Sequence, residues 1–101
     1  MENKLKRRIT AYKKIFPTVK NLKIGPSSAK NKRFCATFTL KGENKKVNFG
    51  LDTATTYFDD PSLKTKRYAY LARASKITNK DGKFTYKIAG TANSFAYYIL
   101  W

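Results

Sequence analysis

Three carboxylates near the middle of the chain are the side chains best suited to direct chemistry. Asp59 and Asp60 are adjacent, and Asp52 lies shortly before them. Carboxylates grouped in this way can hold a divalent cation, as nuclease sites do. However, Pro61 follows Asp60 where a helix is expected to begin, and this order is typical of a helix cap. We therefore expect these acids to favour a helix N-terminus and expect no metal.

Other catalytic groups are scarce. The sequence contains no histidine, the most frequent general base and the most frequent nitrogen ligand of zinc. Cys35 is the single cysteine, and it alternates with Phe34 and Ala36, which places it on the sheet face opposite theirs. No phosphate-binding motif follows the soft "IGPSS" stretch. We predict a protein that is not an enzyme and that uses no cofactor.

Positive charge is the dominant feature of the composition. Twenty-two Lys and Arg face six Asp and Glu, which gives a formal net charge of +16. A charge excess of this size repels itself in the folded state and is relieved by a polyanion. Because Lys predominates over Arg, point-charge contacts with phosphates are favoured over reading of base edges. The expected partner is nucleic acid, double-stranded DNA first, bound without sequence preference.

The basic residues form clusters at the beginning of the chain, before and inside an expected hairpin, and in a central helix. The expected nucleic-acid-binding residues are Lys6, Arg7, Arg8, Lys13, Lys14, Lys32, Arg33, Lys45, Lys46, Lys66, Arg67 and Arg73. Tyr57, Tyr68 and Tyr86 are available to stack on unpaired bases, whereas Tyr12 falls on an apolar stripe and is expected in the core. The alternative is that these basic faces are only solvated.

Hydrophobic periodicity predicts a helix and three strands in the first half. The apolar residues of segment 5–16 recur at helical spacing, and Pro17 ends this helix. Segment 18–24 has the pattern of a short strand. Residues 33–50 have the pattern of a hairpin with a four-residue turn, with these apolar residues on one face: Phe34, Ala36, Phe38, Leu40, Val47 and Phe49.

The pattern of the second half of the sequence predicts a further helix and one further strand. Asp60 as N-cap begins a helix that runs to about Ala74, and Lys66 and Arg73 share one of its faces. "NKDG" is a turn. Phe84, Tyr86 and Ile88 alternate with polar residues, which favours a strand, with a structured loop as the alternative.

The final run "GTANSFAYYILW" is the most apolar segment of the chain. We prefer a short helix capped by Thr91 to a strand. Its apolar residues fall on two sides, Phe95 and Ile99 on one and Leu100 and Trp101 on the other, so it must be covered on several sides. The cover is the chain's own core or a second copy, which would form a homodimer. We also expect a Lys or Arg near the end of this helix.

The expected architecture is a single basic α+β domain over residues 1–101. A small antiparallel sheet of three to four strands is packed by an N-terminal helix, a middle helix and a short C-terminal helix. No run has the length that a transmembrane segment needs.

Three segments carry a family resemblance. "KKVNFG", "YLAR" and "TANSFAYYILW" follow the order and spacing of a small basic domain of uncharacterised function in giant nucleocytoplasmic large DNA viruses, including the marseillevirus group. Ala74 stands where that pattern has His, and Asn93 and Ser94 replace a Gly-aromatic pair. The matching residues are Phe49, Gly50, Tyr70, Arg73, Thr91, Ala92, Leu100 and Trp101.

The resemblance implies a viral protein packaged in the virion and present in the host cytoplasm or nucleus during infection; it implies no reaction. Together with the charge, it predicts a non-enzymatic nucleic-acid-binding protein that compacts or packages the genome. The alternatives are a virion or host-directed interaction module that binds acidic partners and, third, a membrane-surface role for the first helix.

Overall fold

The computed structural model describes residues 2–53 and 55–101 and has the expected α+β architecture, with one antiparallel sheet. The helices and strands are α1 (Glu2–Ile15), β1 (Lys20–Pro26), β2 (Lys32–Leu40), β3 (Glu43–Leu51), α2 (Lys64–Ala74) and α3 (Ala92–Phe95). Two short helical turns complete the fold, η1 (Thr85–Lys87) and η2 (Ala96–Leu100). Because η2 directly continues α3, we refer to the two together as the C-terminal helix.

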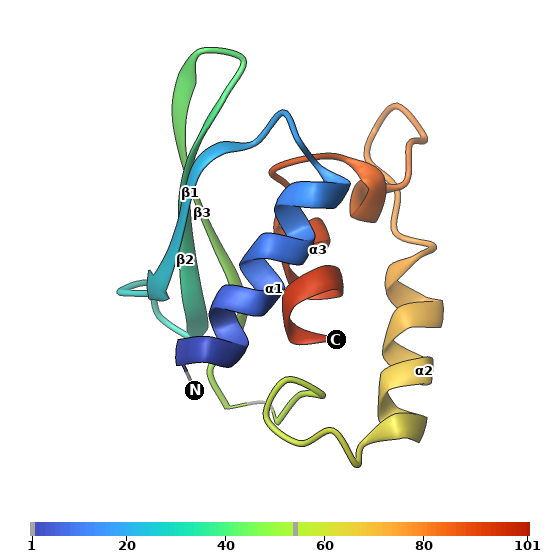
Figure 1. Cartoon of the computed structure of the whole chain (residues 1–101). Coiled ribbons are helices and arrows are strands. Elements are labelled where there is room, and N and C mark those ends of the chain that lie inside the picture. Colours follow the sequence, from blue (N-terminus) through green and yellow to red (C-terminus); the bar gives the residue numbers. More distant parts are fainter. Residues whose placement is uncertain (1, 54) are drawn as a thin grey trace.

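The elements form three layers. Figure 1 shows the sheet on one side, α1 and the C-terminal helix in the middle, and α2 on the far side. Strands β1 and β3 both pair with β2, so β3 is an edge strand. The inner sheet face buries Ala36, Phe38 and Phe49, as the alternation predicted.

The β2–β3 hairpin is confirmed, but its turn is shorter than expected. The strands are connected by Lys41 and Gly42 alone, not by four residues. Both residues have positive φ, 53° and 79°, which is the conformation of a type I′ turn. This turn matches the twist of the two strands, so pairing extends to Leu40 and Glu43.

Helix α1 begins at Glu2 and ends before Pro17, close to the predicted bounds. Tyr12 and Phe16 are buried, and Leu5 and Ile9 are partly buried against the same core. The Tyr12 hydroxyl is satisfied inside the protein, because it pairs with Ser94 Oγ at 2.8 Å and accepts from the Gly90 N–H at 3.0 Å. Tyr12 is therefore a core residue, as expected from its place on the apolar stripe.

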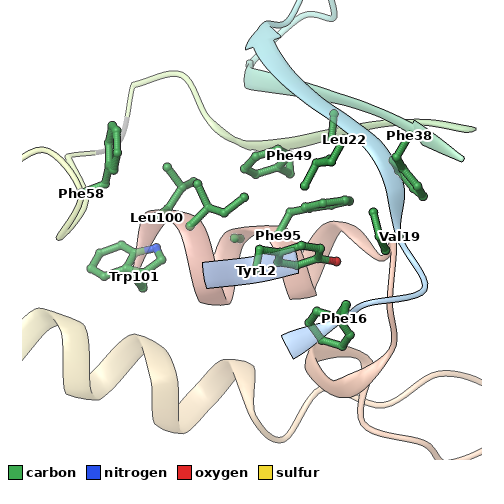
Figure 2. Packing of buried hydrophobic residues seen from close by; sticks show 13 residues of the cluster. Tyr12, Phe16, Val19, Leu22, Phe38, Phe49, Phe58, Phe95, Leu100 and Trp101 are labelled. Carbon is green, nitrogen blue, oxygen red and sulfur yellow. The ribbon is translucent and has the colours of Figure 1, made fainter. Parts of the chain in front are cut away.

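The C-terminal helix is the centre of the core. Thr91 Oγ1 accepts from the Ser94 N–H at 3.1 Å, which confirms the predicted cap. Phe95 stacks on Tyr12 and Phe49, with ring centroids 4.6 and 5.3 Å away, and lies 5.4 Å from Phe38 (Figure 2). Helix and sheet thus meet at one aromatic side chain.

The second apolar side of this helix is covered by the same chain. Trp101 stacks on Tyr70 of α2 with a centroid distance of 4.6 Å and is 6% exposed. The Arg67 Nε–H donates to the Trp101 main-chain oxygen at 2.8 Å, so the basic side chain expected near the end of this helix is present. Both sides are covered without a second copy.

Helix α2 begins later than predicted. It starts at Lys64 with Leu63 as N-cap, and no side chain caps it. The Asp60 carboxylate instead accepts from the backbone N–H and the hydroxyl of Ser62, at 3.0 and 2.7 Å. This short-range pairing holds residues 60–62 in a turn, so Asp60 and Pro61 precede the helix rather than begin it.

The strand predicted at residues 84–88 is wrong, and the alternative of a structured loop is right. Phe84 makes a single bridge to Thr78, after which Thr85–Lys87 forms a helical turn. Thr91 Oγ1 donates to the Thr85 carbonyl at 2.7 Å, which fixes this turn against the start of the C-terminal helix. Tyr86 packs on Tyr97, with centroids 4.7 Å apart.

Gly90 provides a stability test. Its φ is +81°, and a Cβ atom there would lie 2.9 Å from the Phe38 ring, whereas a Cβ at Gly82, with φ +77°, would meet nothing within 4 Å. Both Ala variants carry the backbone strain, but only Gly90→Ala overpacks the core. We expect Gly90→Ala to lower the free energy of unfolding by about 1–3 kcal/mol more than Gly82→Ala in chemical denaturation. Equal losses would contradict the tight packing of Phe38 on residue 90.

Trp101→Ala tests which chain covers the aromatic run. Because Tyr70 and the core cover Trp101, its truncation should lower the free energy of unfolding by about 3–5 kcal/mol at every protein concentration. Denaturation at several concentrations, with sedimentation of the folded protein, measures this. A variant that kept its stability and only shifted from dimer to monomer would show instead that a partner subunit covers Trp101.

Candidate nucleic-acid interface

The predicted basic residues are spread over the surface. Four of them, Lys6, Arg7, Lys13 and Lys14, are exposed on α1, facing away from the core. Lys32, Lys45 and Lys46 are exposed on the hairpin strands, and the remaining ones lie on α2 or are partly buried. No single face carries the full set.

Arg33 is committed to an ion pair. Its guanidinium forms a two-pronged contact with the Asp59 carboxylate, with Nη1 donating to Oδ2 at 2.6 Å. The backbone N–H and the hydroxyl of Thr56 also donate to Asp59 Oδ2, at 2.9 and 3.1 Å. The hydrogen bonds from Arg33 are the main cause that lowers the pKa of Asp59 to about 2. Arg33 therefore contributes a structural contact, although the sequence predicted a phosphate contact.

The outer face of the sheet is polar and basic. Lys23, Thr37 and Lys46 lie side by side on β1, β2 and β3, and all three are exposed. Cys35 occupies this face, as predicted, and is partly buried. The aromatic residues of β2 and β3 belong to the core cluster on the inner face, so the sheet strands offer no stacking platform. Lys45 pairs with Glu43 at 3.3 Å, an exposed contact of small energetic weight.

Two predicted residues from distant segments meet at one aromatic ring. Arg8 of α1 and Arg67 of α2 both approach Tyr57, with their guanidinium carbons 5.8 and 5.0 Å from the ring centroid. Tyr57 comes from the segment that connects β3 to α2. We call Arg8, Tyr57 and Arg67 the basic-aromatic cluster.

The cluster holds two like charges in a partly buried position. Burial is the main cause that lowers the pKa of Arg8; nearby Tyr57 opposes the decrease and Arg67 adds to it. Among the described residues, no ion pair joins Arg8 or Arg67 to an Asp or Glu side chain. Arg67 uses its Nε–H on the Trp101 main-chain oxygen. The remaining N–H groups of the two guanidinium groups favour an anion that accepts from both, such as a phosphate.

Further groups extend the cluster along α2. A shallow cavity of about 150 Å³ is lined by Tyr57, Lys64, Arg67 and Tyr68. Tyr68 is 68% exposed, so its side chain is available for stacking. Both tyrosines were predicted from the sequence to be available for stacking. Lys64 was not among the predicted binding residues, because only the position of α2 beside Tyr57 brings it to the site.

Lys66 and Arg73 share a face, as predicted, but not the face of the basic-aromatic cluster. Both line a larger cavity on the other flank of α2, together with Tyr70 and Trp101. Lys66 and Arg73 therefore line one cavity of α2, and Lys64 and Arg67 line the other.

The acids do not form a metal site. Across residues 2–53 and 55–101, the structure contains no group of three His, Cys, Asp or Glu side chains that could hold an ion. Asp59 is paired with Arg33, and Asp60 is used in its own turn. In the same described ranges, every helix is too short or too polar to cross a bilayer.

Comparison with known proteins places the chain in a family. Residues 22–74, just over half of the chain, match the model of a Family of unknown function (DUF5754). The chain belongs to this family. The match runs from β1 to the end of α2, so it includes Tyr57, Arg67, Tyr70 and Arg73.

A curated relative agrees with this assignment. "Uncharacterized protein L851" of Acanthamoeba polyphaga mimivirus is 36% identical over 102 residues, and the alignment covers 100% of both chains. The expected resemblance to uncharacterised proteins of giant viruses is thus confirmed at that level. No solved structure matches the chain.

Asp59 predicts how stability depends on pH. Its pKa is lowered on folding, so its ion pair stabilises the protein fully above about pH 4, the range of an unfolded Asp. This contribution is lost as the pH falls toward the folded value of about 2. Asp59→Asn should therefore lower stability at neutral pH, and its deficit relative to the wild type should shrink in acid. Thermal melts along a pH series measure this, with Asp81→Asn as the control. A deficit independent of pH would contradict the ion pair's role.

Proposed function

We propose that the protein is a non-enzymatic nucleic-acid-binding protein that contacts phosphates without sequence preference. The observation that carries the proposal is the basic-aromatic cluster, in which Arg8 and Arg67 converge on Tyr57 and neither pairs with an Asp or Glu side chain of the described residues. The net charge of +16 supplies the long-range attraction to a polyanion. Double-stranded DNA is the first expected ligand.

The distribution of charge supports binding that ignores sequence. Basic side chains are exposed on α1, on the outer sheet face and on α2, so a duplex meets point charges at several places. Such contacts fix position on the phosphate backbone but carry no base information. On α1 the exposed basic residues Lys6, Lys13 and Lys14 are lysines, which favour point-charge contacts with phosphates over reading of base edges.

The similarity to a viral protein supports a role in a virus particle or an infected cell. A basic protein of this size, related to a mimivirus protein, suits compaction or packaging of a large DNA genome in the virion, in a marseillevirus-like manner. The host cytoplasm or nucleus would be its location during infection. Because the C-terminal helix is covered by its own chain, the proposal includes no dimer through that segment.

Salt dependence tests the electrostatic mechanism. If about six phosphates are contacted, log K for duplex DNA against log salt should have a slope of about −5, because each contact releases condensed counterions. Fluorescence anisotropy on duplexes of unrelated sequence measures both the slope and the specificity. A slope near zero, tight binding to one sequence only, or binding to acidic polypeptide with none to duplex DNA would each contradict the proposal.

Charge substitutions test the cluster itself. Arg8→Gln with Arg67→Gln should reduce the salt slope by about 2, whereas Lys80→Gln with Lys83→Gln, the same charge loss in an exposed turn, should change it less. Because Arg67 also bonds the Trp101 main chain, Arg8→Lys with Arg67→Lys provides a second variant. It keeps the charge, so the slope should persist while affinity falls several-fold with the loss of two-pronged contacts. Equal effects of the glutamine pairs would show that the cluster has no special role.

A further inference from the structure

A cavity of about 530 Å³ lies between α2, the end of β3 and the C-terminal helix. This volume is within the range of small-molecule binding sites. It is separate from the basic-aromatic cluster, because the two sites share no lining residue and occupy opposite flanks of α2.

The inner wall of the cavity is apolar and aromatic. Leu100 and Trp101 of the C-terminal segment line it, and Tyr70 stacks on Trp101 with only 13° between the ring planes. On the α2 side the lining includes Ala69, whose small side chain is exposed and fills little of the cavity. Gly50 and Leu51 at the end of β3 complete the lining.

The rim carries charge of one sign. Lys66 Nζ is 5.9 Å from the Trp101 ring centroid, and the Arg73 guanidinium carbon is 5.8 Å from that of Tyr70. The Lys66 ammonium group donates one hydrogen bond to the Thr55 carbonyl, at 3.0 Å, and its other N–H groups can donate to a ligand. None of the described residues that line the cavity has an acidic side chain. The arrangement therefore fits a ligand with an anionic group and a flat apolar body.

We propose that this cavity binds a nucleoside phosphate, with its base against the aromatic wall and its phosphate on the rim formed by Lys66 and Arg73. A flat base suits an aromatic wall better than a flexible acyl chain does, because stacking on aromatic side chains favours planar groups. The site does not depend on duplex binding by the basic-aromatic cluster.

The single tryptophan makes the proposal directly measurable. Trp101 is the only Trp of the chain and lines the cavity, so its fluorescence reports occupation. Adenosine 5′-monophosphate should change this emission and release or absorb heat in calorimetry. Adenosine and inorganic phosphate should each bind at least about tenfold more weakly, because each lacks one half of the recognised ligand. Dodecanoate, an anion with a flexible chain, serves as the competing ligand class.

Two variants locate the site. Ala69→Leu places a larger side chain into the cavity from an exposed helix position, and Arg73→Gln removes a rim charge; each should weaken adenosine 5′-monophosphate binding at least about tenfold. Lys80→Gln, the matched charge control, should leave it unchanged. Duplex DNA binding should survive Ala69→Leu, so a failure here is distinguishable from a failure of the proposed function.

The source of the nucleotide can be separated in the same assay. If a short single-stranded oligonucleotide displaces adenosine 5′-monophosphate, and if Ala69→Leu weakens binding of that oligonucleotide, the ligand is an unpaired nucleotide within a strand. If the oligonucleotide does not displace it, the ligand is a free nucleotide. Either result supports the site. Binding of dodecanoate without adenosine 5′-monophosphate, or mononucleotide binding that Ala69→Leu and Arg73→Gln leave intact, would overturn it.

Discussion

The burial of the C-terminal helix is the constraint on which the rest of the structure depends. Phe95 is fully buried where α1 and the sheet meet, and it contacts aromatic rings from both. On the opposite side of the helix, Trp101 provides the surface on which α2 rests. A helix that is apolar all round needs neighbours on every side. The other elements are arranged as those neighbours, with the sheet, α1 and α2 each covering one part.

This arrangement leaves the basic residues outside the core, where they repel one another. Acids are few, and Asp59 is fully used in holding Arg33 against the segment before α2. Other cations lie over aromatic rings, including Arg67 over Tyr57, Arg73 over Tyr70 and Lys4 over Phe58. Such contacts hold a cation without neutralising it. The surface thus keeps its charge for an external anion while its long side chains stay ordered.

The sequence predicted those parts of the fold in which one local pattern is decisive. The α1 stripe, the alternation of the hairpin and the Thr91 cap each depend on a few neighbouring residues, and all three are confirmed. The strand predicted at residues 84–88 is wrong because alternation alone cannot supply a pairing partner. The predicted Asp60 cap is wrong because the Asp60 carboxylate accepts a hydrogen bond from Ser62, two residues away, in a turn that precedes α2.

The candidate sites were predictable as residue types but not as groups. Arg8, Tyr57 and Arg67 were each identified, yet their meeting depends on α2 docking through Trp101, which no local pattern encodes. The cavity beside Tyr70 was not anticipated. The one sequence feature that pointed to it was the shared helix face of Lys66 and Arg73. Its aromatic wall includes Trp101, which is distant in the sequence, so the cavity could not be predicted from a local pattern.

The central position of the C-terminal helix also affects how the chain folds. Tyr12 and Ser94, which join α1 to this helix by a buried hydrogen bond, are 82 residues apart in the sequence. Contacts of such long range require most of the chain to be ordered before they contribute, which slows folding. Until residues 92–101 are in place, the aromatic faces of α1 and the hairpin have no cover. During synthesis the early elements therefore remain exposed to aggregation, and α2 gains its docking surface last.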